Sequence, residues 1–294
     1  MMSSENVAAA NERDGCEMTS TLQTINVAGI QFTPVTGDID ANLAAIASLA
    51  RQAKAEHEEI ELLAVPELAL SGYNAGTDFF DLAVSWPNDS AIERLSELAQ
   101  DLHTVIVAGY PERSPAFGRI YDSAAIIDAD GTPLKSYRKT HCLDTERHFF
   151  TNGAELPIVQ TLAGTIGVMI CWDGAMPEVA RTYALQGADY LVMIGAWEDP
   201  YVEDWELVVS ARAYDNCIPV LAVNRTGIDG GSSFSGHSRI VDCLGKTTAQ
   251  ARNEENAVVA GLIDLTHMRA VRKGYGSQLR DRRPELYGAL AHND

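Results

Sequence analysis

Residues 165–178 read TIGVMICWDGAMPE, and two hydrophobic patterns meet within them at Cys171. The residues before Cys171 form a continuous apolar run, which is typical of a buried strand. Pro177 stands where the first turn of a helix would begin, and the apolar residues after it recur at helical spacing. The pattern predicts a strand, a turn that carries Cys171, and a helix.

This position makes Cys171 a candidate nucleophile. A side chain at a strand-to-helix turn lies at the carboxyl edge of the sheet, and the helix N-terminus favours the thiolate. Taken alone, the stretch is equally consistent with a small buried hydrophobic residue. Two further segments favour chemistry, because an apolar strand at residues 62–66 leads into Glu67 and a strand at residues 134–138 leads into Lys139. If these strands share one sheet, an acid, a cation and a thiol converge at its edge.

Three motifs contain these residues: PELALSGY at 66–73, YRKTH at 137–141 and ICWDGAMPE at 170–178. In order and spacing they resemble the signature motifs of the nitrilase superfamily of carbon–nitrogen hydrolases. The resemblance covers about residues 24–290 and continues through four further segments, at residues 210–216, 224–227, 234–238 and 280–287.

Helix and strand patterns alternate in both halves of the chain. Helices are predicted at residues 38–57, from an N-cap at Ser90, after Cys171 and at residues 205–215. Strands are predicted at residues 25–31, 62–66, 104–109, 120–127, 134–137, 158–162, 165–170, 190–194 and 220–223, and three weaker ones at 238–241, 247–251 and 257–263 are expected to close the sheet. Two helix-covered sheets packed face to face satisfy this alternation. The resemblance implies the same α/β fold, a four-layer α-β-β-α sandwich of two packed mixed sheets with outer helices.

The composition predicts one domain after a short tail. With 294 residues, 46% of them hydrophobic, the chain can bury a large core. Residues 1–23 lack periodicity and are rich in polar residues and alanine, so we expect a disordered tail. The single hydrolase domain is predicted at residues 24–294. It includes a basic, aromatic C-terminal tail from about residue 270, and in the family such tails commonly reach across a dimer interface.

Charge and cysteine usage narrow the class of protein. The net charge of -19, from 22 Lys and Arg against 41 Asp and Glu, argues against nucleic-acid binding. There is no apolar stretch near 18 residues and no signal-peptide pattern, so we expect no membrane partner. The five cysteines show no close spacing and no ligand-spaced histidine, which suits a reducing cytoplasm and argues against a metal. The resemblance implies a cytoplasmic homodimer or higher homo-oligomer.

Hydrolysis of an amide needs a nucleophile, a proton acceptor and donors for the developing oxyanion. With the three motifs in order, Cys171 is the nucleophile and Glu67 the general base. A free thiol is only a few per cent thiolate near pH 7, so it needs such a base. Lys139 and the backbone N–H of Trp172 are expected to hold the oxyanion. Glu146 matches an additional acid of the family that keeps Lys139 and the substrate in line; the alternative is a solvated loop acid.

The substrate pocket is predicted from aromatic residues near these motifs. Tyr73, Trp172 and Trp197 are candidates to line it, with a core role as the alternative. The segment at residues 195–205 follows a strand and precedes a helix, so we expect it to set specificity. Its acids would favour a neutral or cationic substrate tail if they point inward; they are Glu198, Asp199 and Glu203.

Two positions depart from the usual family pattern. Asp122 stands where asparagine is common, and Cys243 where proline often precedes a glycine turn. Neither is expected to touch the chemistry.

The residue that distinguishes between functions within the family is Asp173. Members that resemble nitrilases tend to carry Glu there, whereas Asp is common in amidases and N-carbamoyl amidohydrolases. We therefore expect an amidase that forms a thioester at Cys171 and releases ammonia, with small-molecule amide and water as reactants and no cofactor. The alternatives are an N-carbamoyl amidohydrolase, since residues 170–178 also resemble carbamoylputrescine hydrolases, then a nitrilase, and last a non-catalytic family member.

Overall fold

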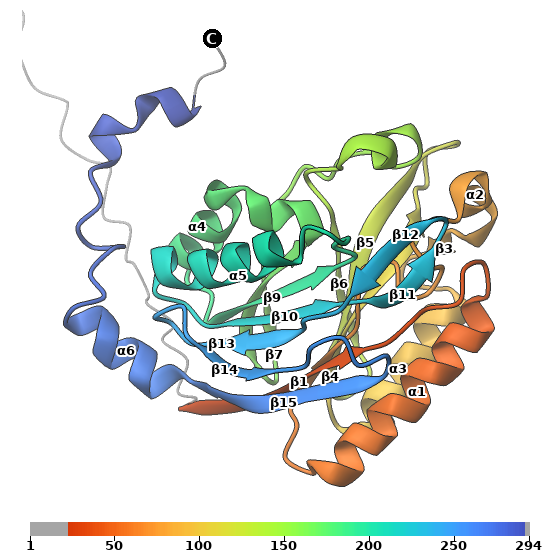
Figure 1. The fold of residues 1–294 in the computed structure, drawn as a ribbon, viewed down its shortest axis with the longest axis horizontal. Helices are drawn as coiled ribbons and strands as arrows, with labels where there is room; N and C mark the ends of the chain where they lie inside the picture. The colour runs from red at the N-terminus through yellow and green to blue at the C-terminus, as the bar shows by residue number, and fades with distance from the viewer. Residues whose placement is uncertain (1–22, 292–294) are drawn as a thin grey trace, which may run out of the picture.

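The computed structural model describes residues 23–291, which contain two mixed β-sheets packed face to face (Figure 1). The first sheet has the order β15 (Ala257–Asp264), β1 (Thr24–Gln31), β2 (Leu62–Ala64), β4 (Val105–Arg113), β5 (Ile120–Ile127) and β6 (Pro133–Arg138), with β3 (Val84–Ser85) beside β4. The second has the order β14 (Thr247–Gln250), β13 (Arg239–Val241), β10 (Val220–Asn224), β9 (Tyr190–Gly195), β8 (Gly164–Ile170) and β7 (Ile158–Thr161).

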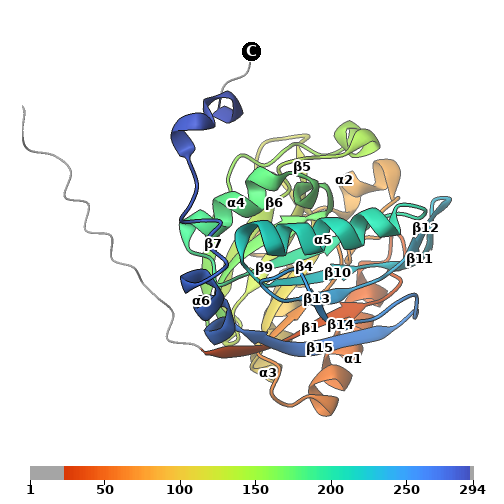
Figure 2. The same cartoon turned by 60° about the vertical axis from the view of Figure 1, so that its left-hand side comes forward.

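Helices cover the outer face of each sheet (Figures 1 and 2). Those over the first sheet are α1 (Ile39–Glu56) and α3 (Ser90–Leu102), and those over the second are α4 (Pro177–Gln186) and α5 (Val202–Asn216). A single apolar cluster joins the inner faces of the two sheets, where Val107 and Ala124 pack with Val168 and Val192. The predicted four-layer α-β-β-α sandwich is confirmed.

The helix ends follow from local side-chain chemistry. Asp38 caps α1, because its carboxylate accepts a hydrogen bond from the N–H of Ala41 at 2.9 Å. The N-cap of α3 is Asp89 and not Ser90 as predicted. Asp89 lies in an extended conformation just before the helix, so its carboxylate reaches the free N–H of Ala91, whereas Ser90 is already helical.

The strands near the C-terminus divide between the sheets. The three weaker strands predicted here were expected to close a single sheet. Instead, β13 and β14 extend the second sheet, whereas β15 pairs antiparallel with β1 in the first sheet. A small hairpin, β11 (Thr226–Asp229) and β12 (Ser232–Ser235), turns at the Gly-Gly pair of residues 230–231. It lies near the ends of β9 and β10 and therefore near the site.

Short elements complete the described chain. They are η1 (Gly76–Asp78), α2 (Phe79–Leu82), η2 (Asp144–His148), η3 (Cys171–Ala175), α6 (Leu265–Lys273), η4 (Pro284–Leu286) and η5 (Gly288–Ala291). After α6 the chain leaves the body of the molecule (Figure 2). Within residues 23–291 we find no helix with the length and apolar character needed to span a bilayer. The predicted N-terminal tail lies outside the described residues, apart from its last residue.

Candidate active site

The strand-to-helix turn at Cys171 is built as the sequence predicts. Strand β8 ends at Ile170, Cys171 opens the short helix η3, and Pro177 begins α4. Cys171 adopts a left-handed backbone conformation, with φ of 47°, which is unusual for a residue with a side chain and is often retained at functional sites. Its side chain is 3% exposed and lies at the wall of a cavity of about 560 Å³. The turn therefore presents the thiol to this cavity.

Lys139 lies at the centre of a buried cluster of carboxyl groups. Its Nζ atom is 2.5 Å from Oε1 of Glu67 and 2.8 Å from Oε1 of Glu146. Glu67 follows β2, Lys139 follows β6 and Glu146 lies in η2, so three separate segments meet here. All three side chains are buried. The expectation that the three strands share one sheet is wrong, because β2 and β6 belong to the first sheet and β8, which leads to Cys171, belongs to the second. The acid and the cation meet at the first sheet, and the thiol comes from the sheet packed against it. Glu146 is a buried partner of Lys139 and not a solvated loop acid.

Backbone and hydroxyl donors hold the two glutamates. The N–H of Ala196, just after β9, donates to Oε2 of Glu67 at 2.6 Å. Glu146 accepts from the hydroxyl of Tyr73 at 2.7 Å and from the N–H of Leu143 at 2.8 Å. Each carboxylate thus has donors besides Lys139, although burial raises the pKa of Glu146.

Burial determines the protonation state of the thiol. Burial and the negative charge of Glu67 raise the pKa of Cys171 well above the ordinary thiol value, although Lys139 opposes them. The expectation that the thiolate is favoured does not agree with this, because burial of the thiol raises its pKa. For Lys139, burial acts to lower the pKa, but the nearby carboxylates of Glu67 and Glu146 have the larger effect. The pKa of Lys139 is therefore raised well above its usual value. The resting pair is a neutral thiol and a charged ammonium.

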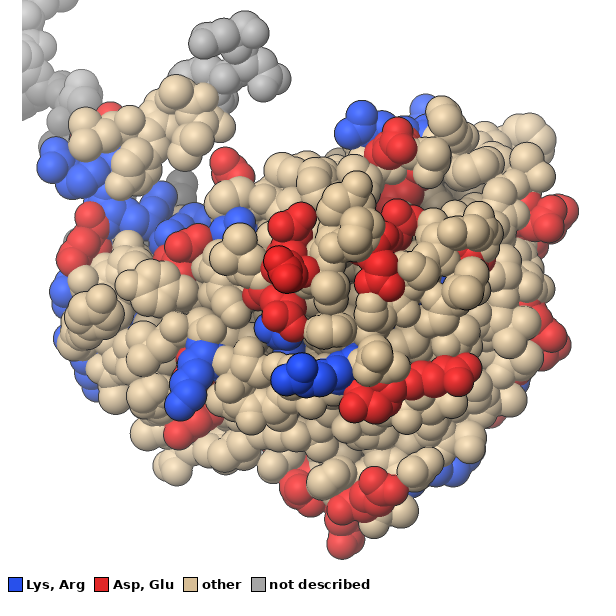
Figure 3. All heavy atoms as spheres, viewed as in Figure 1, with Lys and Arg blue, Asp and Glu red and all other residues tan. Residues whose placement is uncertain are grey.

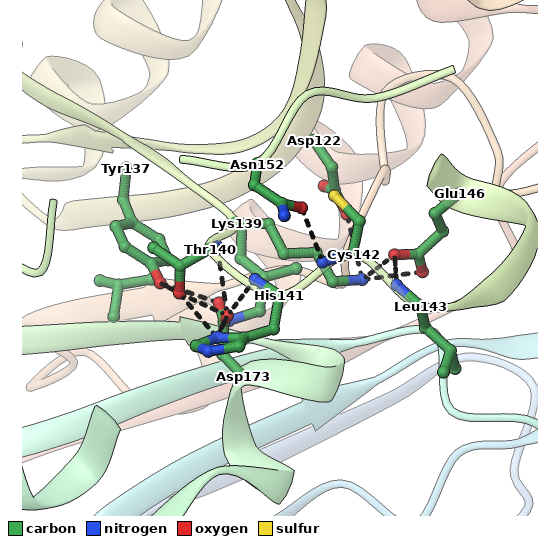
Figure 4. Close-up of polar contacts among 12 residues, drawn as sticks. Asp122, Tyr137, Lys139, Thr140, His141, Cys142, Leu143, Glu146, Asn152 and Asp173 are labelled. Atoms are coloured by element: carbon green, nitrogen blue, oxygen red, sulfur yellow. Dashed lines mark hydrogen bonds and ion pairs between the residues drawn. The ribbon is translucent and has the colours of Figure 1, made fainter. Parts of the chain in front are cut away.

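Asp122 also belongs to this cluster, contrary to the expectation that it lies away from the chemistry. It is on β5, fully buried, and its Oδ2 atom lies 3.4 Å from Nζ of Lys139 (Figure 4). Its backbone carbonyl accepts from the N–H of Lys139 at 2.8 Å, so the strand pairing itself brings the two residues together. The only sequence signal was the departure from the family pattern at this position. Cys243, the other departure, is buried in the apolar core.

A metal ion does not fit among these acids. Carboxyl oxygens of Glu67, Asp122 and Glu146 lie within 4.8 Å of one another, as ligands would. However, the ammonium of Lys139 contacts all three and takes the place that a cation would need. The cluster is an ion-paired site built around lysine.

Asp173 connects the nucleophile turn to the lysine segment (Figure 4). Its buried carboxylate accepts hydrogen bonds from the hydroxyl of Tyr137 at 2.8 Å and the N–H of Ile170 at 3.1 Å. It also accepts from the backbone and side chains of Thr140 and His141, at 2.8–3.2 Å. The hydrogen bond to Asp173 raises the pKa of His141. Asp173 therefore fixes the distance between the segments that carry Cys171 and Lys139.

All three aromatic residues predicted to line the pocket do so. Tyr73, Trp172 and Trp197 border the cavity, and the indole rings of the two tryptophans lie 5.9 Å apart. The segment after β9 also contributes as expected, through Ala196, Glu198, Tyr201 and Asp204. Of the acids named from the sequence, Glu198 borders the cavity, whereas Asp199 bonds the hydroxyl of Ser235. The other acids of the wall are Asp204 and Asp144.

The β11–β12 hairpin supports the Tyr73 side of the pocket. Asp229 accepts from the N–H of Tyr73 at 2.8 Å and is paired with the buried Arg225 at 2.5 Å. The guanidinium of Arg225 lies 4.5 Å from the ring centre of Phe234, which contacts Tyr73 edge-on. No local pattern indicates this support, because Asp229 lies 156 positions from Tyr73 along the chain.

Comparisons with known proteins agree with this architecture. The Carbon-nitrogen hydrolase family model matches residues 26–273. The probable nitrilase C965.09 of Schizosaccharomyces pombe is 40% identical over 266 residues, covering 90% of this chain and 98% of that protein. The N-carbamoylputrescine amidase of Solanum lycopersicum is 36% identical, covering 90% and 94%. A carbon–nitrogen hydrolase from Helicobacter pylori G27 has a TM-score of 0.85 at 29% identity, covering 92% and 99%. The chain thus belongs to the carbon–nitrogen hydrolases of the nitrilase superfamily.

Proposed function

We propose that this protein is an amidase that hydrolyses a small linear amide to a carboxylic acid and ammonia. The observation that carries the proposal is the buried Glu67–Lys139–Glu146 cluster beside a neutral Cys171 thiol at the cavity wall. A thiol, a base and a fixed cation in an enclosed site are what attack on an unactivated carbonyl requires. The reaction needs no metal or organic cofactor.

In the first half of the reaction, Sγ of Cys171 attacks the amide carbon while its proton moves to Glu67. The raised pKa of the thiol means that proton transfer and attack occur together, because a free thiolate is unfavourable here. The C–N bond then breaks as Glu67 returns the proton to the leaving nitrogen, and ammonia departs. The product is a thioester on Cys171.

The tetrahedral intermediate places negative charge on the former carbonyl oxygen. The ammonium of Lys139 and the backbone N–H of Trp172 are the donors we assign to it. Trp172 lies in the first turn of η3, where a backbone N–H has no acceptor within the helix. Loss of one such donor typically lowers the rate by about 10²–10³-fold. Glu146 keeps the ammonium in place.

In the second half, Glu67 takes a proton from water and the resulting hydroxide attacks the thioester. The C–S bond breaks, the acid is released and the thiol is restored with the proton from Glu67. The base thus acts in both halves, which requires that it stay anionic between them.

The test is ammonia release from a panel of small amides, N-carbamoyl compounds and nitriles, with Cys171→Ala beside the wild type. Release from amides that the substitution abolishes supports the proposal. Mass spectrometry of the wild type, quenched during turnover, should find an acyl group on Cys171. Undiminished release by Cys171→Ala contradicts the mechanism.

A second candidate is hydrolysis of an N-carbamoyl group, which releases carbon dioxide and ammonia together. Three acidic side chains line the cavity, those of Asp144, Glu198 and Asp204. They favour this second candidate, because negative charge suits a substrate with a cationic tail. The tomato relative at 36% identity is named for N-carbamoylputrescine, the derivative of a diamine.

Product stoichiometry separates the two candidates. Equimolar carbon dioxide and ammonia from an N-carbamoyl amine would select the second. Asp204→Asn should then raise KM for a substrate with an ammonium tail and leave KM for a neutral analogue of equal length unchanged. Equal effects on both substrates would exclude a charge contact at Asp204.

We further propose that the chain forms a homodimer or larger homo-oligomer through its C-terminal arm, defined here as residues 280–291. The arm leaves the body after α6 and exposes Leu286 and Leu290 at 66% and 69% (Figures 1 and 2). On the outer face of α5, Leu207 and Tyr214 are also exposed. Exposed apolar side chains of this kind are typical of contact surfaces.

A further inference from the structure

Asp122 is an acid of the cluster that the proposed mechanism does not use. It is fully buried, and within residues 23–291 neither of its carboxyl oxygens accepts a hydrogen bond from an N–H or hydroxyl donor. Its charged contact is Lys139, at 3.4 Å. Glu67 and Glu146 differ from it, because each accepts a shorter bond from Lys139 and at least one more from a backbone N–H.

The charges of the cluster do not balance if every acid is ionised. One ammonium faces three carboxyl groups whose oxygens lie within 4.8 Å of one another. Three carboxylates would leave two negative charges uncompensated in a buried site, which is strongly unfavourable. One proton must therefore be shared among the acids, and it is most stable on the carboxyl group with the fewest donors. That group is Asp122.

The groups that face Asp122 support this assignment. Burial and the negative charge of Glu67 raise the pKa of Asp122 well above its usual range, and Lys139 opposes them. The carboxyl oxygens of Glu67 and Asp122 lie within 4.8 Å of each other, and the negative charge of Glu146 raises the pKa of Asp122 further. The remaining neighbour, the thiol of Cys142, has a pKa raised to about 12, so it is neutral as well.

We propose that Asp122 is a positioning residue that stays protonated and donates a hydrogen bond to Glu67. The proposal rests on the proposed function, in which Glu67 is the base. A neutral donor on this side leaves Lys139 paired with two carboxylates and holds Glu67 as an oriented anion beside Cys171. The proton on Asp122 is not transferred during the reaction, so the proton transfers of the proposed mechanism are unchanged.

Two substitutions test the proposal through activity. Asp122→Asn keeps a neutral donor of the same size, whereas Asp122→Ala removes it. We expect Asp122→Ala to lower kcat by about tenfold to a hundredfold with little change in KM, and Asp122→Asn to recover most of that loss. Equal loss of kcat in both variants would mean that the carboxylate charge matters, and would overturn the proposal.

Infrared spectroscopy tests the proton directly and does not depend on turnover or on the Ala variant folding. At neutral pH the wild type should show the C=O stretch of a protonated carboxyl group, and Asp122→Asn should lack that band. The matched control is Glu112→Gln, which alters a buried acid of the same sheet that is paired with Arg138 and should keep the band. A wild type without the band overturns the proposal even if the enzyme is active. Silence on the substrate panel with the band present would instead count against the proposed function alone.

Discussion

At the scale of single residues, the carboxylate of Asp173 shows how one side chain sets the geometry of a site. It accepts from donors on two segments, at Tyr137–His141 and at Ile170. The sequence identified Asp173 only through its association with amidases. Its physical role could not be predicted from the sequence, because the donors at Tyr137–His141 lie more than 30 positions from Asp173 along the chain.

We predict that Asp173→Asn lowers kcat by at least about tenfold. The amide that replaces the carboxylate would offer a single acceptor oxygen, and its NH₂ group would face N–H and O–H groups that are themselves donors. Each hydrogen bond to a charged group that is lost costs about 1.5–3 kcal/mol. The kcat for the best amide of the panel measures it, and an NMR titration should show the pKa of His141 returning toward its usual value. His141→Ala, which keeps the carboxylate, is the control and should be milder. Full activity of Asp173→Asn would contradict the positioning role.

A second residue-scale prediction concerns Asp122 and the pH dependence of stability. Because the folded-state pKa of Asp122 is raised, folding takes up a proton here at any pH between the unfolded and folded values. The stabilising contribution is complete below the unfolded pKa and is lost as the pH rises toward the folded one. Asp122→Asn should therefore have a higher Tm than the wild type at pH 7–8.

The measurement is Tm against pH for the two proteins. Each kcal/mol of relief should raise Tm by about 2–4 °C in a chain of this size. The difference should shrink as the pH falls toward about 4, where an unfolded aspartate is itself protonated. A gap in Tm that is constant with pH would show that Asp122 is not the group that takes up the proton.

At the scale of elements, the close approach of β4 to the segment after β2 determines where Glu67 lies. A Cβ atom on Gly109 would lie 2.3 Å from the carbonyl oxygen of Pro66 and 2.7 Å from Cα of Glu67. Both are backbone atoms that cannot turn aside. The sequence shows Gly109 only as the end of an apolar strand, so this requirement for glycine was not predictable.

Gly109→Ala should therefore damage both stability and activity. We expect a loss of about 1–3 kcal/mol in the free energy of unfolding, the usual cost of overpacking, and a lower kcat because Glu67 is displaced. Urea denaturation and the ammonia assay measure the two effects. The control is Gly288→Ala, where no atom lies within 4 Å of the added Cβ. An unaltered free energy of unfolding in Gly109→Ala would mean that the two segments separate easily.

Most elements were predictable because their signals are local. The periodicity of residues 38–57 and the Pro177 start of the helix after Cys171 both correspond to observed helices, α1 and α4. What was not predictable depends on distant partners. β15 pairs with β1 across more than 220 positions, and nothing within residues 257–263 indicates which sheet edge is free. The β11–β12 hairpin was not predicted, because its strands are only four residues each.

At the scale of the whole molecule, charge is unevenly distributed. The chain carries a net charge of -19, yet its C-terminal arm contains Arg280, Arg282 and Arg283. Figure 3 shows Lys and Arg gathered where the arm leaves the body and Asp and Glu scattered over much of the same face. The arm also contains Asp281 and Glu285, so three basic residues against two acidic ones leave it slightly basic. With its exposed apolar side chains, such an arm suits contact with the acidic body of a second copy of the chain. The sequence predicted a basic tail but could not show that it projects.

We predict that deletion of residues 280–294 lowers the oligomeric mass of the protein. The deletion keeps Leu279, which packs against the core, and removes the exposed Leu286 and Leu290, so the fold should persist while the contact between copies is lost. Light scattering coupled to size exclusion gives the mass of both proteins, and circular dichroism checks the fold. The double variant Arg282→Gln, Arg283→Gln separates the contribution of charge from that of apolar contact. Its assembly should be weakened less than that of the deletion variant, and it should depend less on salt concentration than the assembly of the wild type. A deletion variant with the mass of the wild-type assembly would place the interface elsewhere, with the exposed face of α5 the next surface to alter.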